Sequence, residues 1–141
     1  MDEIRSAKPT ANPANRVIIL VIGDLLTLLL FAWIGRSNHA LPVTDVGAII
    51  ATAAPFVMSW FVITPWFGLF SAEVSQNWRK LAPRLLLAWV IGAPLALIVR
   101  ALWLGRSIPA GLHPTFALVA FGFTTLFMLV WRLAYCWWAN R

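Results

Sequence analysis

An acidic side chain lies inside an apolar stretch of the sequence, where an ionised group is costly to place. Asp24 stands within the apolar run of residues 17–34. A charged group at the centre of a membrane span costs roughly 3 kcal/mol, so it usually faces a partner or water. Asp24 could exchange a proton or a cation, it could link helices as a protonated hydrogen-bonding group, or it could orient a ligand.

The depth of other polar residues along their own spans indicates candidate neighbours for this carboxyl. Counted from Arg16 at a rise of about 1.5 Å per residue, Asp24 lies roughly 12 Å inside the span. Residues three or four apart share a helix face, and hydroxyls of two other spans fall at a similar depth. We therefore predict an intramembrane polar cluster of Asp24, Thr27, Ser59 and Thr125. Arg100 lies about 12 Å further along the axis, too far for a direct pair without considerable tilt or bending of the helices.

A second group of side chains that could do chemistry falls near the opposite ends of the spans. It consists of Arg36, His39, Arg100 and Arg106. Guanidinium groups recognise phosphate and carboxylate through a planar fork of donors, which predicts contact with an anion or a lipid head group. The alternative interpretation is a solvated loop border without a ligand.

Other kinds of site find little support in the residue types. His39 and His113 could share a metal, but no third ligand stands near them, so we expect no metal and no cofactor. A Ser-His-Asp set, a phosphate-binding Gly loop and paired carboxylates are all missing, so we expect no enzymatic activity. The single Cys136 cannot form a disulfide within the chain.

The elements that must position these side chains are long apolar segments. Of 141 residues, 61% are hydrophobic and only 11% are charged, which excludes a disordered chain and an ordinary soluble domain. Four apolar runs approach the ~20 residues that cross a bilayer. We predict an all-α, integral membrane four-helix bundle. It comprises an N-terminal tail over 1–15, a transmembrane domain over 16–138 with spans at about 17–35, 46–65, 84–104 and 114–134, and a short end at 139–141.

Several local signals define these spans more closely. Thr44 or Asp45 can cap the second span, and Pro83 suits the first turn of the third. Pro55 and Pro94 each remove a backbone hydrogen bond inside a span, which predicts two kinks. The aromatic stretch 66–70 is interrupted by Gly and is expected in the head-group zone.

The distribution of basic residues predicts the orientation. Cytoplasmic termini leave eight Lys and Arg residues inside (Arg5, Lys8, Arg16, Arg79, Lys80, Arg84, Arg132 and Arg141) and three outside (Arg36, Arg100 and Arg106). Because cytoplasmic loops are enriched in basic residues, we predict cytoplasmic N- and C-termini and a multi-pass protein of the inner (plasma) membrane. The net charge of +6 is then topological, and no nucleic-acid partner is expected.

Several short motifs resemble those of a known family. They are Gly23-Asp24-Leu25-Leu26, Ile34-Gly35-Arg36-Ser37-Asn38-His39, Thr52-Ala53-Ala54-Pro55-Phe56, Arg100 and Trp131-Arg132. The pattern is similar to the prokaryotic four-span membrane proteins grouped as the domain of unknown function numbered three-zero-five-four. The resemblance implies a prokaryotic origin and places Asp24, Arg36, His39, Pro55 and Arg100 in the family pattern. It implies no activity.

Two functions remain open at this point. The first is a non-enzymatic membrane subunit or scaffold that packs through its helix faces, with the lipid bilayer and either further copies of itself or a larger membrane complex as partners. The alternative is a small, oligomeric, proton-coupled transporter in which Asp24 is the titrating carboxylate. That alternative rests on architecture alone.

Overall fold

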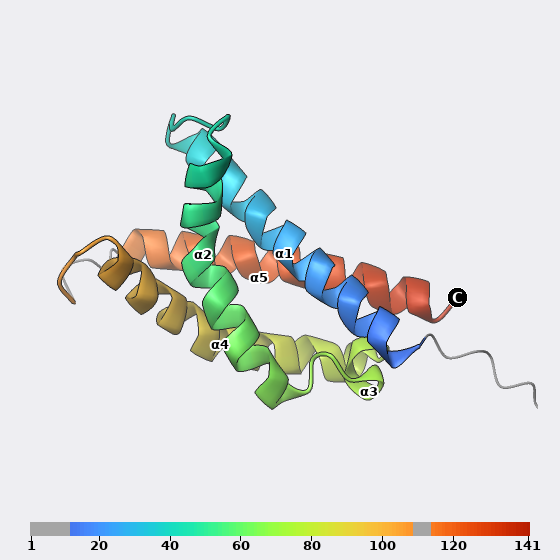
Figure 1. Ribbon diagram of the computed structural model, residues 1–141. Helices are drawn as coiled ribbons and strands as arrows, with labels where there is room; N and C mark the ends of the chain where they lie inside the picture. The colour runs from blue at the N-terminus through green and yellow to red at the C-terminus, as the bar shows by residue number, and fades with distance from the viewer. Residues whose placement is uncertain (1–11, 109–113) are drawn as a thin grey trace, which may run out of the picture.

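The computed structural model describes residues 12–108 and 114–141, which form helices and no strand (Figure 1). The elements in chain order are α1 (Pro13–Asn38), α2 (Val46–Ile63), the 3-10 helix η1 (Thr64–Phe67), α3 (Ala72–Ser75), α4 (Trp78–Trp103) and α5 (Pro114–Ala139).

Four segments are long and apolar enough to cross a membrane. They are α1, the continuous stretch Val46–Phe67, α4 and α5. Many large apolar side chains point outward from them, including Leu26, Val62 and Leu118, which are 60%, 58% and 74% exposed. Outward-facing apolar surfaces of this extent suit lipid rather than water. The prediction of an all-α, four-span membrane protein is confirmed.

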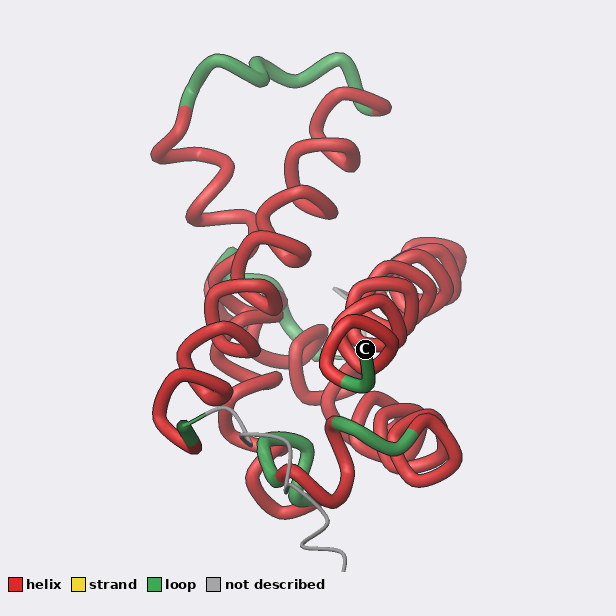
Figure 2. Tube along the Cα trace, turned by 90° about the vertical axis from the view of Figure 1, so that its right-hand side faces the viewer, coloured by secondary structure: helices red, strands yellow, loops and turns green. Residues whose placement is uncertain are grey.

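The four spans form two antiparallel hairpins that diverge from one end of the molecule. Figure 1 shows α1 with α2 rising towards one loop, and α4 with α5 running sideways towards another. The view at 90° in Figure 2 shows the same separation of the two hairpins. The start of α1, the short α3 and the end of α5 gather at the opposite end. Both ends of the described chain therefore lie on one side, and their assignment to the cytoplasm stays a prediction.

Side-chain caps determine where the helices begin. The Asp45 carboxylate accepts a hydrogen bond from the Ala48 amide at 2.9 Å, which confirms the predicted cap of the second span. Asn12 and Asn77 cap α1 and α4 in the same way. As a result α1 takes in the last residues assigned to the tail, and α4 begins six residues before the predicted span.

Pro83 consequently lies inside α4 and not in its first turn. Proline is excluded from helix interiors mainly because it removes one amide donor and crowds the preceding turn. Pro83 is the sixth residue of α4, past the four amides that lack a helical partner, so the Arg79 carbonyl loses its usual donor four residues on. Pro55 and Pro94 also lie within continuous helices, and the predicted kinks at these two residues stay predictions.

The connection between α2 and α4 is more ordered than the sequence predicts. The stretch 66–70, whose place in the head-group zone stays a prediction, forms part of η1 and a turn at Gly68, whose φ of 64° is left-handed. Trp66 is 85% exposed, as expected for an interfacial residue, but Leu69 is buried. The turn thus directs the backbone of Leu69 into the bundle, where its carbonyl meets the candidate site.

Candidate functional site

The carboxylate of Asp24 is completely buried and accepts four hydrogen bonds. Its Oδ1 accepts from Trp131 Nε1 at 3.1 Å and from Arg132 Nε at 2.9 Å. Its Oδ2 accepts from Trp60 Nε1 at 2.7 Å and from Arg132 Nη2 at 2.6 Å. Both oxygens are therefore occupied by donors from α2 and α5.

Arg132 is the counter-ion, and its side chain is also completely buried. Its two bonds to the carboxylate form the bidentate geometry that guanidinium groups favour. The remaining Nη1 donates to the Leu69 carbonyl at 2.7 Å, and the guanidinium lies 5.0 Å from the centre of the Phe70 ring. We call Asp24, Trp60, Leu69, Trp131 and Arg132 the ion-pair cluster.

Gly23 makes room for one member of this cluster. A Cβ atom added at Gly23 would lie 1.8 Å from Cζ2 of Trp131, far inside van der Waals contact. The glycine therefore lets the indole cross the backbone of α1 closely enough for its N–H to reach Asp24. This is the close approach for which small residues are used between membrane helices.

The arrangement favours a structural role for the buried charges. A buried ion pair is tolerated when further hydrogen bonds satisfy both partners, and losing one partner leaves an uncompensated charge that costs several kcal/mol. Asp24 and Arg132 meet the requirement for further hydrogen bonds, and the loss of either one would leave the other as an uncompensated charge. The cluster joins α1, α2, α5 and the α2–α4 connection at one point.

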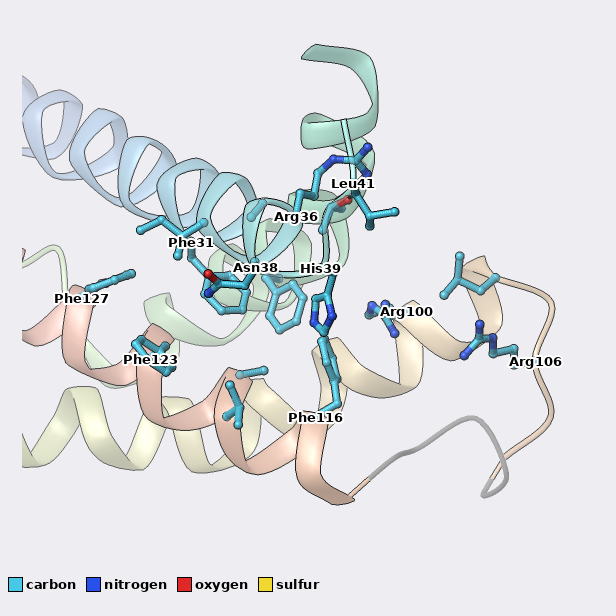
Figure 3. Close-up of a pocket in the computed structure, with 18 residues that line it drawn as sticks. Phe31, Arg36, Asn38, His39, Leu41, Arg100, Arg106, Phe116, Phe123 and Phe127 are labelled. Atoms are coloured by element: carbon cyan, nitrogen blue, oxygen red, sulfur yellow. Dashed lines mark hydrogen bonds between the residues drawn. The ribbon is translucent and has the colours of Figure 1, made fainter. Parts of the chain in front are cut away.

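A cavity of about 540 Å³ lies at the diverging end of the two hairpins (Figure 3). Its basic and imidazole side chains are Arg36, His39, Arg100 and Arg106, the four residues of the predicted anion or lipid contact. Five phenylalanines line it as well: Phe31, Phe56, Phe116, Phe123 and Phe127. We call this space the outer cavity. The structure therefore gathers the predicted residues around one shared space.

Two arginines of the outer cavity, Arg36 and Arg100, contact neutral groups. Arg36 donates to the Pro42 carbonyl from Nε at 3.1 Å and from Nη2 at 3.0 Å, and its Nη1 lies 3.5 Å from the Thr52 hydroxyl. The Arg100 guanidinium lies 4.4 Å from the centre of the Phe116 ring, a cation–π contact. Figure 3 shows His39 and Phe116 pointing toward one another across the cavity.

Within the described parts of the chain, no three His, Cys, Asp or Glu side chains gather in a way that could hold a metal ion. The two-histidine metal idea includes His113, which lies outside the described residues.

A family model described as "Protein of unknown function (DUF3054)" matches residues 21–135. The chain belongs to this family. No curated protein and no solved structure matches it. The matched range of this DUF3054 chain includes the whole ion-pair cluster and the four basic and imidazole residues of the outer cavity.

None of the three hydroxyls predicted as neighbours of the Asp24 carboxyl donates a hydrogen bond to it in this DUF3054 protein. Thr27 donates instead to the Gly23 carbonyl of its own helix at 2.7 Å. The hydroxyls of Ser59 and Thr125 are buried and have no hydrogen-bond partner among the described residues. Asp24 takes charged and indole donors in their place, because an ionised carboxylate binds charged donors more strongly than hydroxyls.

The sequence places Arg132 at a cytoplasmic border and therefore does not predict it as the partner of Asp24. That assignment ended the fourth span near residue 134, whereas α5 continues to Ala139. The extra turns place Arg132 about 10 Å inside the helix end, close to the depth estimated for Asp24. One signal in the sequence could have indicated donors for Asp24, because Trp60 and Trp131 carry indole N–H groups and fall within the predicted spans. Arg132 therefore leaves the count of solvent-facing basic residues.

Proposed function

We propose that this DUF3054 protein is a non-enzymatic subunit or scaffold of a prokaryotic plasma membrane. The ion-pair cluster is the observation that supports this proposal. Asp24 accepts four hydrogen bonds from Trp60, Trp131 and Arg132, and this arginine in turn contacts the Leu69 carbonyl and the Phe70 ring. In this proposal the two charges hold the hairpins in a defined arrangement, and the outward faces meet lipid or partner helices.

The alternative of proton-coupled transport through Asp24 is less well supported. A carrier carboxylate must lose its partner and meet water or substrate during each cycle. Asp24 does not line the outer cavity, and neither does Arg132. At least one of the four donors, two of which belong to one guanidinium, would have to be displaced before the carboxylate could take up a proton.

Infrared spectroscopy of the reconstituted protein tests the role of Asp24 directly. A structural, ion-paired Asp24 remains ionised across the neutral pH range, so wild-type protein and Asp24→Asn show no difference in the carboxylic acid C=O stretch. The matched control is Asp45→Asn, compared with the wild type after acidification, because the acid band of this exposed carboxyl must then be detectable. A carboxylic acid band that titrates in the wild type and is missing from Asp24→Asn would support the transporter instead.

Association with other chains needs a separate measurement. Gentle extraction followed by native mass spectrometry reports stoichiometry and bound partners together. A subunit or scaffold is expected to appear as a defined oligomer or with a partner in fixed ratio. A strictly monomeric protein at every detergent concentration would contradict this part of the proposal.

A further inference from the structure

The outer cavity combines positive charge with an apolar wall. Its charged side chains come from both hairpins, since Arg36 belongs to α1 and Arg100 to α4. Among the lining residues that the structure describes, none is acidic. Arg36 lies two residues before the end of α1, and Arg100 three residues before the end of α4. The charges are therefore placed where the spans leave the hydrocarbon region.

The positive charges of this cavity have no counter-ion in the described chain. Two ion pairs are found in the described chain, Asp24–Arg132 and Glu73–Lys80, and neither includes a residue that lines the outer cavity. The carbonyl and hydroxyl that bind Arg36 are neutral, so its charge remains. Arg100 and Arg106 line the same cavity, and two like charges brought together in this way disfavour one another. An anion placed between them would relieve this repulsion and neutralise partly buried charge.

The rest of the cavity is unsuited to a free anion. Phe31, Phe56, Phe123 and Phe127 form an aromatic wall, and Val119 adds an aliphatic side chain. Apolar lining of this extent stabilises a ligand that buries hydrocarbon. The volume of about 540 Å³ lies within the usual range of small-molecule sites. A single ligand with an anionic head and an apolar chain would match both the basic side chains and the aromatic wall of the outer cavity.

We infer that the outer cavity binds one anionic lipid. Its phosphate or carboxylate head lies against Arg100 and Arg106, and part of its chain passes between the hairpins along the phenylalanine wall. This inference goes beyond the proposed subunit role. It would hold for a monomer as well as for an assembly, so the two proposals can fail separately.

Lipid titration of the purified full-length protein provides the test. The probe is dioleoyl-phosphatidylglycerol, added to protein in a zwitterionic detergent and counted by native mass spectrometry. One tightly bound copy is expected, together with weaker binding at higher salt because exposed charges are screened. Dioleoyl-phosphatidylcholine, with the same chains and no net charge, is expected to bind at least about tenfold more weakly.

Two pairs of variants separate the head site from the chain site. Arg106→Gln is expected to weaken phosphatidylglycerol binding about tenfold, since one charge-assisted contact is lost. Its control is Arg79→Gln, at the opposite end of α4 and outside the cavity. Val119→Trp fills the apolar half and should weaken binding by a similar factor. The neighbouring Leu118→Trp, which does not line the cavity, should have no effect.

The outcomes that overturn the inference are distinct. Equal binding of phosphatidylcholine would show that the arginines do not select a head group. Inorganic phosphate that binds as tightly as the lipid, and is unaffected by Val119→Trp, would make this a site for a free anion. Arg106 lies beyond the end of α4, so its variant tests the head site without altering helix packing. Unchanged lipid binding by that variant would remove the proposed head contact.

Discussion

The substitution Gly23→Ala provides the sharpest test of the ion-pair cluster, because it adds one methyl group and no charge. The new Cβ would lie 1.8, 2.0 and 2.6 Å from three atoms of the Trp131 indole. Ordinary carbon contacts lie at about 3.5–4.0 Å, so the ring must move by more than about 1 Å. That displacement breaks the 3.1 Å hydrogen bond from its Nε1 to Asp24.

The expected cost follows from three opposing contributions. Overpacking of a well-packed site costs about 1–3 kcal/mol, and loss of the indole hydrogen bond adds about 1 kcal/mol. Replacing Gly by Ala within a helix returns about 0.5–1 kcal/mol. We therefore expect Gly23→Ala to lower the free energy of unfolding by about 1–3 kcal/mol. Gly122→Ala is the matched control, since an added Cβ there meets no atom within 4 Å.

Reversible unfolding in mixed micelles, followed by circular dichroism, measures both variants. The indole N–H resonance of Trp131, assigned with Trp131→Phe, reports whether the ring has moved. In a Trp131→Ala background the methyl group has nothing to displace, so Gly23→Ala should cost much less there. If Gly23→Ala were as stable as Gly122→Ala and left the indole resonance in place, our account of this glycine would be refuted.

Three further predictions concern other contacts. Arg132→Met alone should lower the free energy of unfolding by about 3–5 kcal/mol, because it leaves the Asp24 charge buried and unpaired. The double variant Arg132→Met with Asp24→Leu should recover most of that loss. Chemical unfolding of both variants measures this, and equal stability of the single and the double variant would contradict it. Trp89→Phe removes the donor of the 2.6 Å bond to the Thr124 hydroxyl and should cost about 1 kcal/mol in the same assay. A hydrogen bond from Lys80 and the charge of that lysine lower the pKa of the exposed Glu73 carboxyl. The small stabilising effect of Glu73 should therefore be present above its pKa in the unfolded chain and vanish as the pH falls through its pKa in the folded chain. Glu73→Gln should abolish that part of the pH dependence of the thermal midpoint, and an unchanged profile would contradict the assignment.

The sequence was sufficient to predict the spans and to group the basic residues that line the outer cavity, for a common physical reason. Hydropathy and helical rise report position along the bilayer normal, and Arg36 and Arg100 needed only the same depth to be grouped together. The partner of Asp24 required more than depth. Helix rotation decides which side chains face each other, and an error of a few residues at the end of α5 moved Arg132 to the surface in the prediction.

The buried Leu69 was missed for a related reason. A Gly-interrupted aromatic stretch has the composition of a head-group segment, and its local signal does not distinguish a loop from a folded turn. The decisive contact is the bond from Arg132 to its carbonyl, made between residues 63 positions apart. Backbone acceptors leave no trace in residue type, so this contact was invisible before the fold was known.

The separation of the two charged residues in the chain has a consequence for biosynthesis. Asp24 and Arg132 are 108 positions apart, in the first and the last span. Because a ribosome makes the chain from its N-terminus, the carboxyl enters the membrane long before its guanidinium has been synthesised. Any product that stops short of α5 keeps the indole donor of Trp60 but lacks the guanidinium that neutralises Asp24, so the first span carries an uncompensated acid until the last span is in place.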